Sequence, residues 1–198
     1  MSLSNFQYYN KYDVYLDVYH KCAQTSLLHY FGAPWLNQPG VFGYPNPIRN
    51  LKKWKWSERF EIIAFIRNPF DRVVSQYFYH MEYLRKRLPE YNNYTFKDYV
   101  EDHMKGSKKI GWVRPICDYP TWNVLGYCPT FIGRYETFDD DLRRVHEKFK
   151  IEFNGIPWIN KSTLRKKVPY KEMYTEDFMI SHVMDFYKKD LEKFNYKF

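Results

Sequence analysis

The chain has 198 residues, 44% of them hydrophobic, which is enough for one globular domain with a sizeable core. No stretch approaches the roughly 18 apolar residues that a membrane span needs, and the three cysteines form no C-x-x-C pair, which argues against a disulfide framework or a cysteine-based zinc site. The formal net charge of +8 favours an anionic partner: nucleic acid, an anionic membrane, a sulfated glycan or a phosphorylated cofactor.

The first predicted unit is a strand, a loop and a helix. Residues 12–19 alternate and are rich in β-forming side chains, so they predict a strand. The polar residues 20–25 follow as a short loop, and residues 26–31 look like the start of a helix. Residues 33–50 are dense in Pro and Gly and predict a long loop, a feature that is often functional in a compact domain.

The second predicted unit repeats this order. Residues 60–67 are almost continuously apolar, as expected for a strand buried on both faces of a parallel sheet. Asn68 can cap the next helix, Pro69 suits its first position, and Asp71 is favourable in its first turn. We expect this helix to run to about Arg87.

Capping signals predict two more helices in the C-terminal half. Thr95 with Asp98 resembles a capping box, and the helix that it opens should end near Gly106. Thr175, with two acidic residues after it, should open the last helix, which we expect to end in a turn containing Lys188 and Lys189.

Between these helices, a short strand is predicted at residues 130–135. Thr137 with Asp140 resembles a second capping box, and its helix should run to about Phe149. The repeated strand-to-helix units predict an α/β fold, with a mostly parallel sheet flanked by helices.

We expect a single domain over residues 1–198, with residues 1–5 outside the folded part or a cloning remnant. In parallel sheets, ligands bind beyond the carboxyl ends of the strands. The candidate site therefore consists of the loops at residues 20–25 and 67–69.

The first loop has the composition of a phosphate site. Backbone N–H groups at a helix start favour an anion, Lys21 adds a point charge, and Thr25 and Ser26 add hydroxyl donors. The loop has no glycine and so is not a Walker A motif. The alternative is a polar loop in which Thr25 or Ser26 only caps the helix.

The second loop contains an arginine that needs an anionic partner. Arg67 ends a buried strand, where an unpaired charge is costly. Arg67 and Ser75 can converge on one phosphate, which suits the planar arginine fork. The alternative is a structural ion pair of Arg67 with Asp71 or Glu61.

Together the two loops resemble the signature motifs of the sulfotransferase superfamily. One motif is a strand followed by a lysine loop ending in Thr-Ser, here residues 20–27, and the other is a strand ending in Arg-Asn-Pro with Arg and Ser on the helix, here residues 66–77. Residues 132–142 and 159–162 and the ending at 187–196 resemble the carbohydrate-type branch.

The resemblance implies a P-loop-nucleotide-kinase-like sulfotransferase fold and a cofactor, 3′-phosphoadenosine 5′-phosphosulfate (PAPS), which leaves as 3′,5′-adenosine bisphosphate (PAP). Lys21 would contact the bridging oxygen, and Arg67 with Ser75 the 3′-phosphate. Lys161 and Arg165 would lie in a basic loop that closes over the cofactor. The 5′-phosphate would be held by the first loop, through Cys22, Ala23, Gln24, Thr25 and Ser26.

The implied chemistry is in-line transfer of sulfonate to an acceptor hydroxyl, with a carbohydrate favoured, or to an amine, and it needs no metal. The acceptor must lose a proton, so a base is expected near Lys21. Candidates are His20, beside that lysine, and His29, His80 and Glu82. The residues do not choose among them.

Two other functions stay open. The chain could be a catalytically weak member that binds PAPS or PAP, or a basic, aromatic-rich nucleic-acid-binding protein; the missing Walker glycines disfavour a nucleotide kinase. We expect a small-molecule or glycan acceptor, no nucleic acid partner and no membrane span. The start has no apolar run of signal-peptide length, which predicts a cytoplasmic protein of bacterial or viral origin. The oligomeric state and the identity of the acceptor stay open.

Overall fold

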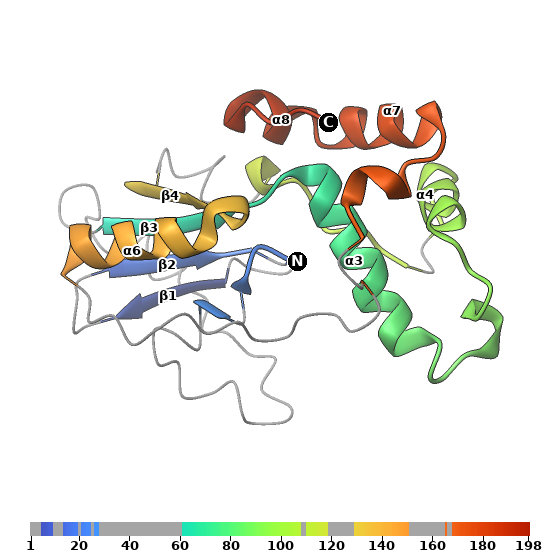
Figure 1. The fold of residues 1–198 in the computed structure, drawn as a ribbon, viewed down its shortest axis with the longest axis horizontal. Helices are drawn as coiled ribbons and strands as arrows, with labels where there is room; N and C mark the ends of the chain where they lie inside the picture. The colour runs from blue at the N-terminus through green and yellow to red at the C-terminus, as the bar shows by residue number, and fades with distance from the viewer. Residues whose placement is uncertain are drawn as a thin grey trace. The chain divides into compact units, whose positions relative to one another are not determined.

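The computed structural model describes residues 5–9, 14–19, 21–24, 26–27, 61–107, 110–118, 129–150, 165 and 168–198. The chain forms two compact units (Figure 1). Unit 1 comprises Met1–Ile66 and Tyr119–Asn160, and unit 2 comprises Arg67–Asp118 and Lys161–Phe198. The predicted α/β class is confirmed, since a small, mostly parallel sheet combines with helices; a single domain over the whole chain stays a prediction.

The described residues of unit 1 form a four-stranded sheet in the order β1-β2-β3-β4. The strands are β1 (Asn5–Tyr9), β2 (Val14–Val18), β3 (Glu61–Ile66) and β4 (Phe131–Arg134). β2 pairs with β3, and β3 with β4, in parallel, whereas β1 pairs with β2 in antiparallel fashion. The three parallel strands match the predicted ones, and β1 was not predicted.

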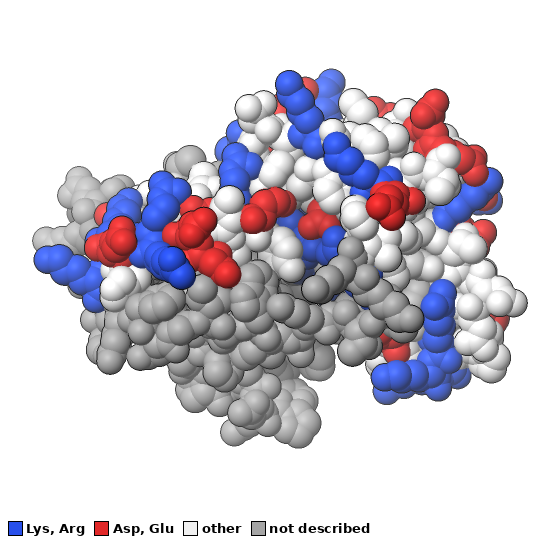
Figure 2. All heavy atoms as spheres, in the orientation of Figure 1, with Lys and Arg blue, Asp and Glu red and all other residues white. Residues whose placement is uncertain are grey.

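Helix α6 (Phe138–Phe149) supplies one wall of the core of unit 1. Phe65 and Ile63 of β3 pack with Phe138 and Leu142 of α6 in one buried cluster. The intervening β3 side chains, Ala64 among them, are buried as well, so β3 is covered on both faces, as its apolar run predicted. Over α6, basic and acidic side chains are interspersed (Figure 2).

The capping box predicted at Thr137 and Asp140 is wrong. A 3₁₀ turn, η4 (Tyr135–Thr137), leads directly into α6, and Thr137 makes no capping hydrogen bond. Its hydroxyl instead donates to Asp141 Oδ2 at 2.7 Å, and the same oxygen accepts the N–H of Arg134 at 2.8 Å. The Asp141 carboxylate therefore connects the end of β4 to the start of α6 through hydrogen bonds.

Unit 2 is helical. Its elements are α3 (Pro69–Leu84), η2 (Pro89–Tyr91), α4 (Phe96–Met104), η3 (Ile116–Asp118), η5 (Tyr170–Met173), α7 (Asp177–Phe186) and α8 (Lys188–Phe194). Asn68 caps α3 by accepting the N–H of Phe70 at 3.0 Å, and Pro69 occupies the first turn, as predicted. The helix ends at Leu84, three residues before the expected Arg87.

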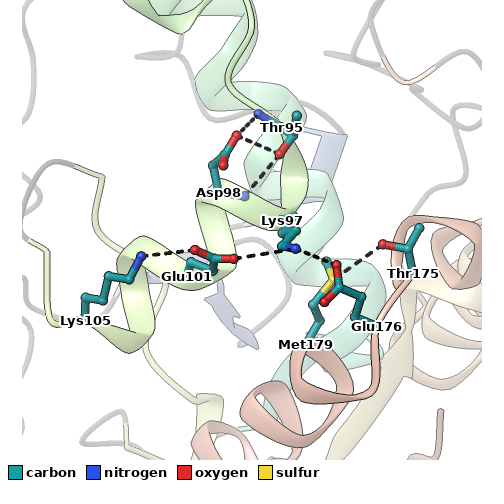
Figure 3. Close-up of polar contacts among 8 residues, drawn as sticks. All are labelled: Thr95, Lys97, Asp98, Glu101, Lys105, Thr175, Glu176 and Met179. Carbon is teal, nitrogen blue, oxygen red and sulfur yellow. Dashed lines mark hydrogen bonds and ion pairs between the residues drawn. The ribbon is translucent and has the colours of Figure 1, made fainter.

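The capping box at the start of α4 is confirmed (Figure 3). Thr95 Oγ1 accepts the N–H of Asp98 at 3.1 Å, and Asp98 Oδ2 accepts the N–H of Thr95 at 2.7 Å. Just beyond the end of this helix, Gly106 adopts a φ of 69°, which glycine tolerates without steric cost. Local sequence signals therefore fixed both ends of α4.

The single last helix predicted after Thr175 is wrong in two respects. Thr175 does not cap it; its hydroxyl lies 3.9 Å from Met179 Sδ (Figure 3). The helix is also interrupted at Tyr187, a fully buried residue whose hydroxyl donates to the Val113 carbonyl at 2.5 Å. Lys188 therefore begins α8 rather than ending a helix.

Candidate functional site

The loop after β2 has an unusual backbone. Lys21 and Ala23 have φ angles of 66° and 58°, a region that residues other than glycine seldom occupy. Each such residue costs roughly 1–2 kcal/mol relative to a right-handed conformation. Left-handed residues alternating with their neighbours turn successive backbone N–H groups toward one side, which forms a concave site for an anion. The two left-handed residues therefore store backbone strain in this loop.

A helix starts within this loop, since the N–H of Leu27 donates to the Ala23 carbonyl at 2.9 Å. Lys21, Ala23 and Gln24 are half-buried, and Ser26 is buried. His20 and Thr25 lie outside the described residues.

The geometry of this loop disfavours the predicted contact of Cys22 with the cofactor. Its side chain is fully buried, and its N–H already donates to the Tyr19 carbonyl at 3.1 Å. The Cys22 thiol therefore fills space in the core of unit 1. Cys117, in unit 2, is buried too, and burial together with the nearby Asp190 carboxylate raises its pKa to about 12.

Arg67, which directly follows β3, belongs to unit 2 and is 3% exposed. Its Nε donates to Asp71 Oδ2 at 2.7 Å. The structural ion pair considered from the sequence is therefore present, and its carboxylate is Asp71. Glu61, the other carboxylate considered, is exposed, and its Oε2 lies 4.0 Å from Lys148 Nζ in unit 1.

Asp71 also binds the predicted loop residue Arg165. The second carboxylate oxygen, Oδ1, accepts a hydrogen bond from Arg165 Nη2. Two residues predicted to contact the cofactor, Arg67 and Arg165, thus meet at one carboxylate within unit 2. Lys161 lies outside the described residues.

Two further groups of the Arg-Asn-Pro motif hold α3 in place. Asn68 Nδ2 donates to the Lys197 carbonyl at 3.0 Å and to the Tyr170 hydroxyl at 3.3 Å. Arg72 is 1% exposed, and its Nη1 donates to the Arg114 carbonyl at 3.2 Å. Ser75, half-buried, lies one turn beyond Asp71 on α3.

Two of the candidate bases can be located. His80 and Glu82 lie on α3, both half-buried, and His80 Nδ1 is 3.4 Å from the Tyr99 hydroxyl. His29, like His20, falls outside the described part of the chain.

The sequence reasoning missed a pair of histidines in unit 2. His103 Nδ1 and His182 Nε2 are 2.7 Å apart, although 79 positions separate the residues in sequence. The His103 ring also stacks on Trp112, with ring centres 4.0 Å apart. Burial, with a smaller contribution from His182, lowers the pKa of His103 to about 4. The pair is therefore uncharged at neutral pH, and no sequence signal joins its two members.

The described ranges contain neither a cluster of metal-binding side chains nor a membrane-spanning helix. Among those residues, no group of three or more His, Cys, Asp and Glu side chains could hold a metal ion. Nor is any helix in the part of the chain that the structure describes both long and apolar enough to cross a bilayer.

Comparison with known proteins gives one family. A sequence model described as "Sulfotransferase family" matches residues 37–197, a range that contains the Arg-Asn-Pro motif and begins after the Lys21 loop. An uncharacterized protein of Archaeoglobus fulgidus is 29% identical over 114 residues, which cover 56% of this chain and 80% of that protein. No solved structure matches the chain.

Proposed function

The chain belongs to the sulfotransferase family, and we propose that it moves a sulfonate group from PAPS to an acceptor hydroxyl, of a carbohydrate by preference, or to an amine. Membership of the family carries the general activity, sulfonate transfer. The donor and the acceptor class are the finer proposal, and they rest on the residues of the two loops.

The left-handed backbone at Lys21 and Ala23 is the observation that carries the proposal. Backbone strain of this kind persists where the surrounding structure enforces it, and such strain is concentrated at functional sites. A strained strand–loop–helix connection with alternating left-handed residues supports binding of the 5′-phosphosulfate by loop amides and by the Ser26 and Thr25 hydroxyls. The Cys22 amide, committed to Tyr19, is left out of this set.

Lys21 would act on the bond that breaks. The donor supplies the sulfonate and a phosphate leaving group, on whose bridging oxygen negative charge develops during in-line displacement. A lysine ammonium held against that oxygen stabilises the charge and can deliver a proton to it. The residue lies in the strained loop and is half-buried, so part of its surroundings excludes water.

The 3′-phosphate would be bound by residues of unit 2. Arg67 and Arg165 present guanidinium groups, whose planar forks match phosphate oxygens, and Ser75 adds a hydroxyl donor from α3. We assign the two loops to one donor molecule because together they resemble the signature motifs of the sulfotransferase superfamily, with Lys161 as a further contact.

Proton removal from the acceptor is assigned to His20, which adjoins Lys21 in sequence. A neutral imidazole is a suitable base near neutral pH. An amine acceptor would demand less of this base than a sugar hydroxyl. The proposal therefore expects the dependence on His20 to be steeper for carbohydrate than for amine acceptors.

The test is transfer of radiolabelled sulfonate from PAPS to a panel of glycans, phenols and amines. Lys21→Ala should lower kcat by about 10²–10³-fold, the usual cost of removing one group that stabilises developing charge. Lys105→Ala is the matched control, because Lys105 is an exposed lysine paired only with Glu101 among the ion pairs of described residues. Equal transfer by Lys21→Ala and by the wild type would contradict the assignment.

A nucleic-acid-binding function has less support. On the face drawn in Figure 2, acidic side chains lie among the basic ones over α6, whereas nucleic-acid binding calls for a continuous basic surface. A catalytically weak family member would bind PAP yet give no transfer to any acceptor of the panel, so a PAP-binding measurement beside the transfer assay identifies it.

A further inference from the structure

Asp71 is the meeting point of two arginines that come from distant parts of the chain. Its two carboxylate oxygens are used separately: Oδ2 accepts from Arg67 Nε at 2.7 Å, and Oδ1 accepts from Arg165 Nη2. Arg165 stands 94 positions further along the sequence. The Asp71 side chain is only 10% exposed, so both hydrogen bonds form largely out of water, where they are strong.

The cluster, defined as Arg67, Asp71 and Arg165, is largely buried, with Arg67 at 3% and Arg165 at 22% exposure. It brings two guanidinium groups to one carboxylate. The planar fork of a guanidinium group matches the oxygens of a phosphate, so two such groups held together suit a phosphate group of the donor.

The contacts also fix orientation. Asp71 accepts a hydrogen bond from Arg67 Nε, and this contact restricts the rotation of the guanidinium plane that carries the two Nη groups. An arginine whose plane is fixed in advance loses less side-chain entropy when it binds a phosphate in bidentate fashion. Through Oδ1, the same carboxylate holds Arg165 beside it.

We propose that Asp71 is a positioning residue of the donor site: its carboxylate holds the Arg67 and Arg165 guanidiniums together so that both contact the 3′-phosphate of PAPS. This inference rests on the proposed function. Asp71 itself makes no contact with the donor and acts through the two arginines. The opposite role, a carboxylate that competes with the phosphate for the same arginines, predicts effects of the opposite sign.

Calorimetric titration of the full chain with PAP separates these roles. Asp71→Asn keeps the size of the side chain but removes its charge, so it should weaken PAP binding by about tenfold or more, the value of one or two charged hydrogen bonds. Unchanged or tighter binding by this variant would overturn the inference. Asp118→Asn is the matched control, since it removes the same charge from an exposed pair with Lys189 and should bind PAP as the wild type does.

A double-mutant cycle tests whether the two residues act as one unit. Arg165→Ala should weaken PAP binding, and Asp71→Asn combined with Arg165→Ala should bind about as weakly as the weaker single variant. Losses that multiply in the double variant would show independent action and overturn the inference. If Asp71→Asn fails to fold, Asp71→Glu takes its place. A second cycle is then made of Asp71→Glu, Arg165→Ala and the variant that carries both changes.

Turnover kinetics provide a readout that a purely structural role would not move. Asp71→Asn should raise KM for PAPS while kcat changes little, since the 3′-phosphate lies away from the reacting sulfur. Asp71→Glu, which restores the charge, should recover part of the affinity. Failure of the wild type to bind PAP would overturn the proposed function together with this inference; wild-type binding with an unaffected Asp71→Asn would overturn this inference alone.

Discussion

The Arg72 guanidinium and the Asp190 carboxylate face each other inside unit 2, with Nη1 3.9 Å from Oδ2 and each side chain 1% exposed. Asp190 also accepts the N–H groups of Ile116 and Cys117 at 2.7 and 2.8 Å. Arg72, the helix arginine that follows Pro69, is therefore part of the core of unit 2, where α3, α8 and η3 meet.

Removing one partner of this buried pair should destabilise unit 2 strongly. Asp190→Ala leaves the Arg72 charge and two backbone N–H groups without their acceptor, so we expect a loss of about 3–5 kcal/mol in the free energy of unfolding. Urea denaturation followed by circular dichroism measures it. Asp118→Ala, at an exposed ion pair, is the control; a loss no larger than that of the control would mean that the pair contributes nothing to stability.

A second prediction concerns the close approach of β3 and β4 in unit 1. Gly133 of β4 pairs with Phe65 of β3, and a Cβ placed on Gly133 would lie 2.4 Å from the Phe65 ring. That ring is fixed by Phe138, whose centre is 5.2 Å away, so it cannot move aside cheaply. Gly133→Ala should therefore lower the free energy of unfolding by about 1–3 kcal/mol.

Thermal denaturation measures the effect of Gly133→Ala, and the same change at Gly111 is the control, since a Cβ there meets nothing within 4 Å. Equal melting temperatures for the two variants would show that the Phe65 ring adjusts without cost.

The histidine pair should make stability depend on pH. The pKa of His103 falls from 6.5 to about 4, first through burial and then through His182, and burial also lowers the pKa of His182, against the opposing effect of Asp185. Unfolded histidines bind protons below about pH 6.5, whereas folded His103 does so only near pH 4, and the pKa of His182 is also lowered. The free energy of unfolding should therefore decrease as the pH falls from 6.5 toward 4, and this pair should have no effect above 6.5.

Urea midpoints measured across this range test the prediction. His103→Gln should flatten the decrease, because it removes the group whose pKa is lowered to about 4. A wild-type slope equal to that of His103→Gln would show that the pair titrates normally in the folded state.

Short-range signals in the sequence predicted much of the fold. The apolar run ending at Ile66 gave β3, Asn68 and Pro69 gave the start of α3, and Thr95 with Asp98 gave the start of α4, because each pattern acts within one turn or one strand. The prediction at Thr137 failed because Asp141 competes for the threonine hydroxyl.

Features that depend on contacts between distant residues could not be predicted from local sequence patterns. Tyr187, where the last helix is interrupted, donates a hydrogen bond to Val113, 74 positions away, and β1 pairs with β2. At the site, the two candidate loops were recognisable from their residue types. That Asp71 joins Arg67 to Arg165 could not be read from any local pattern, because the second partner lies so far along the chain.

The central claim, a PAPS site formed by the Lys21 and Arg67 loops, is tested most directly by the melting temperature of the protein with and without PAP, with ATP, NAD and a short single-stranded DNA as controls. PAP at about 100 times its dissociation constant should add roughly 2.7 kcal/mol of stability. The account predicts a rise with PAP that exceeds every control and disappears in Arg67→Ala. No rise with PAP, or a rise with DNA alone, would contradict it.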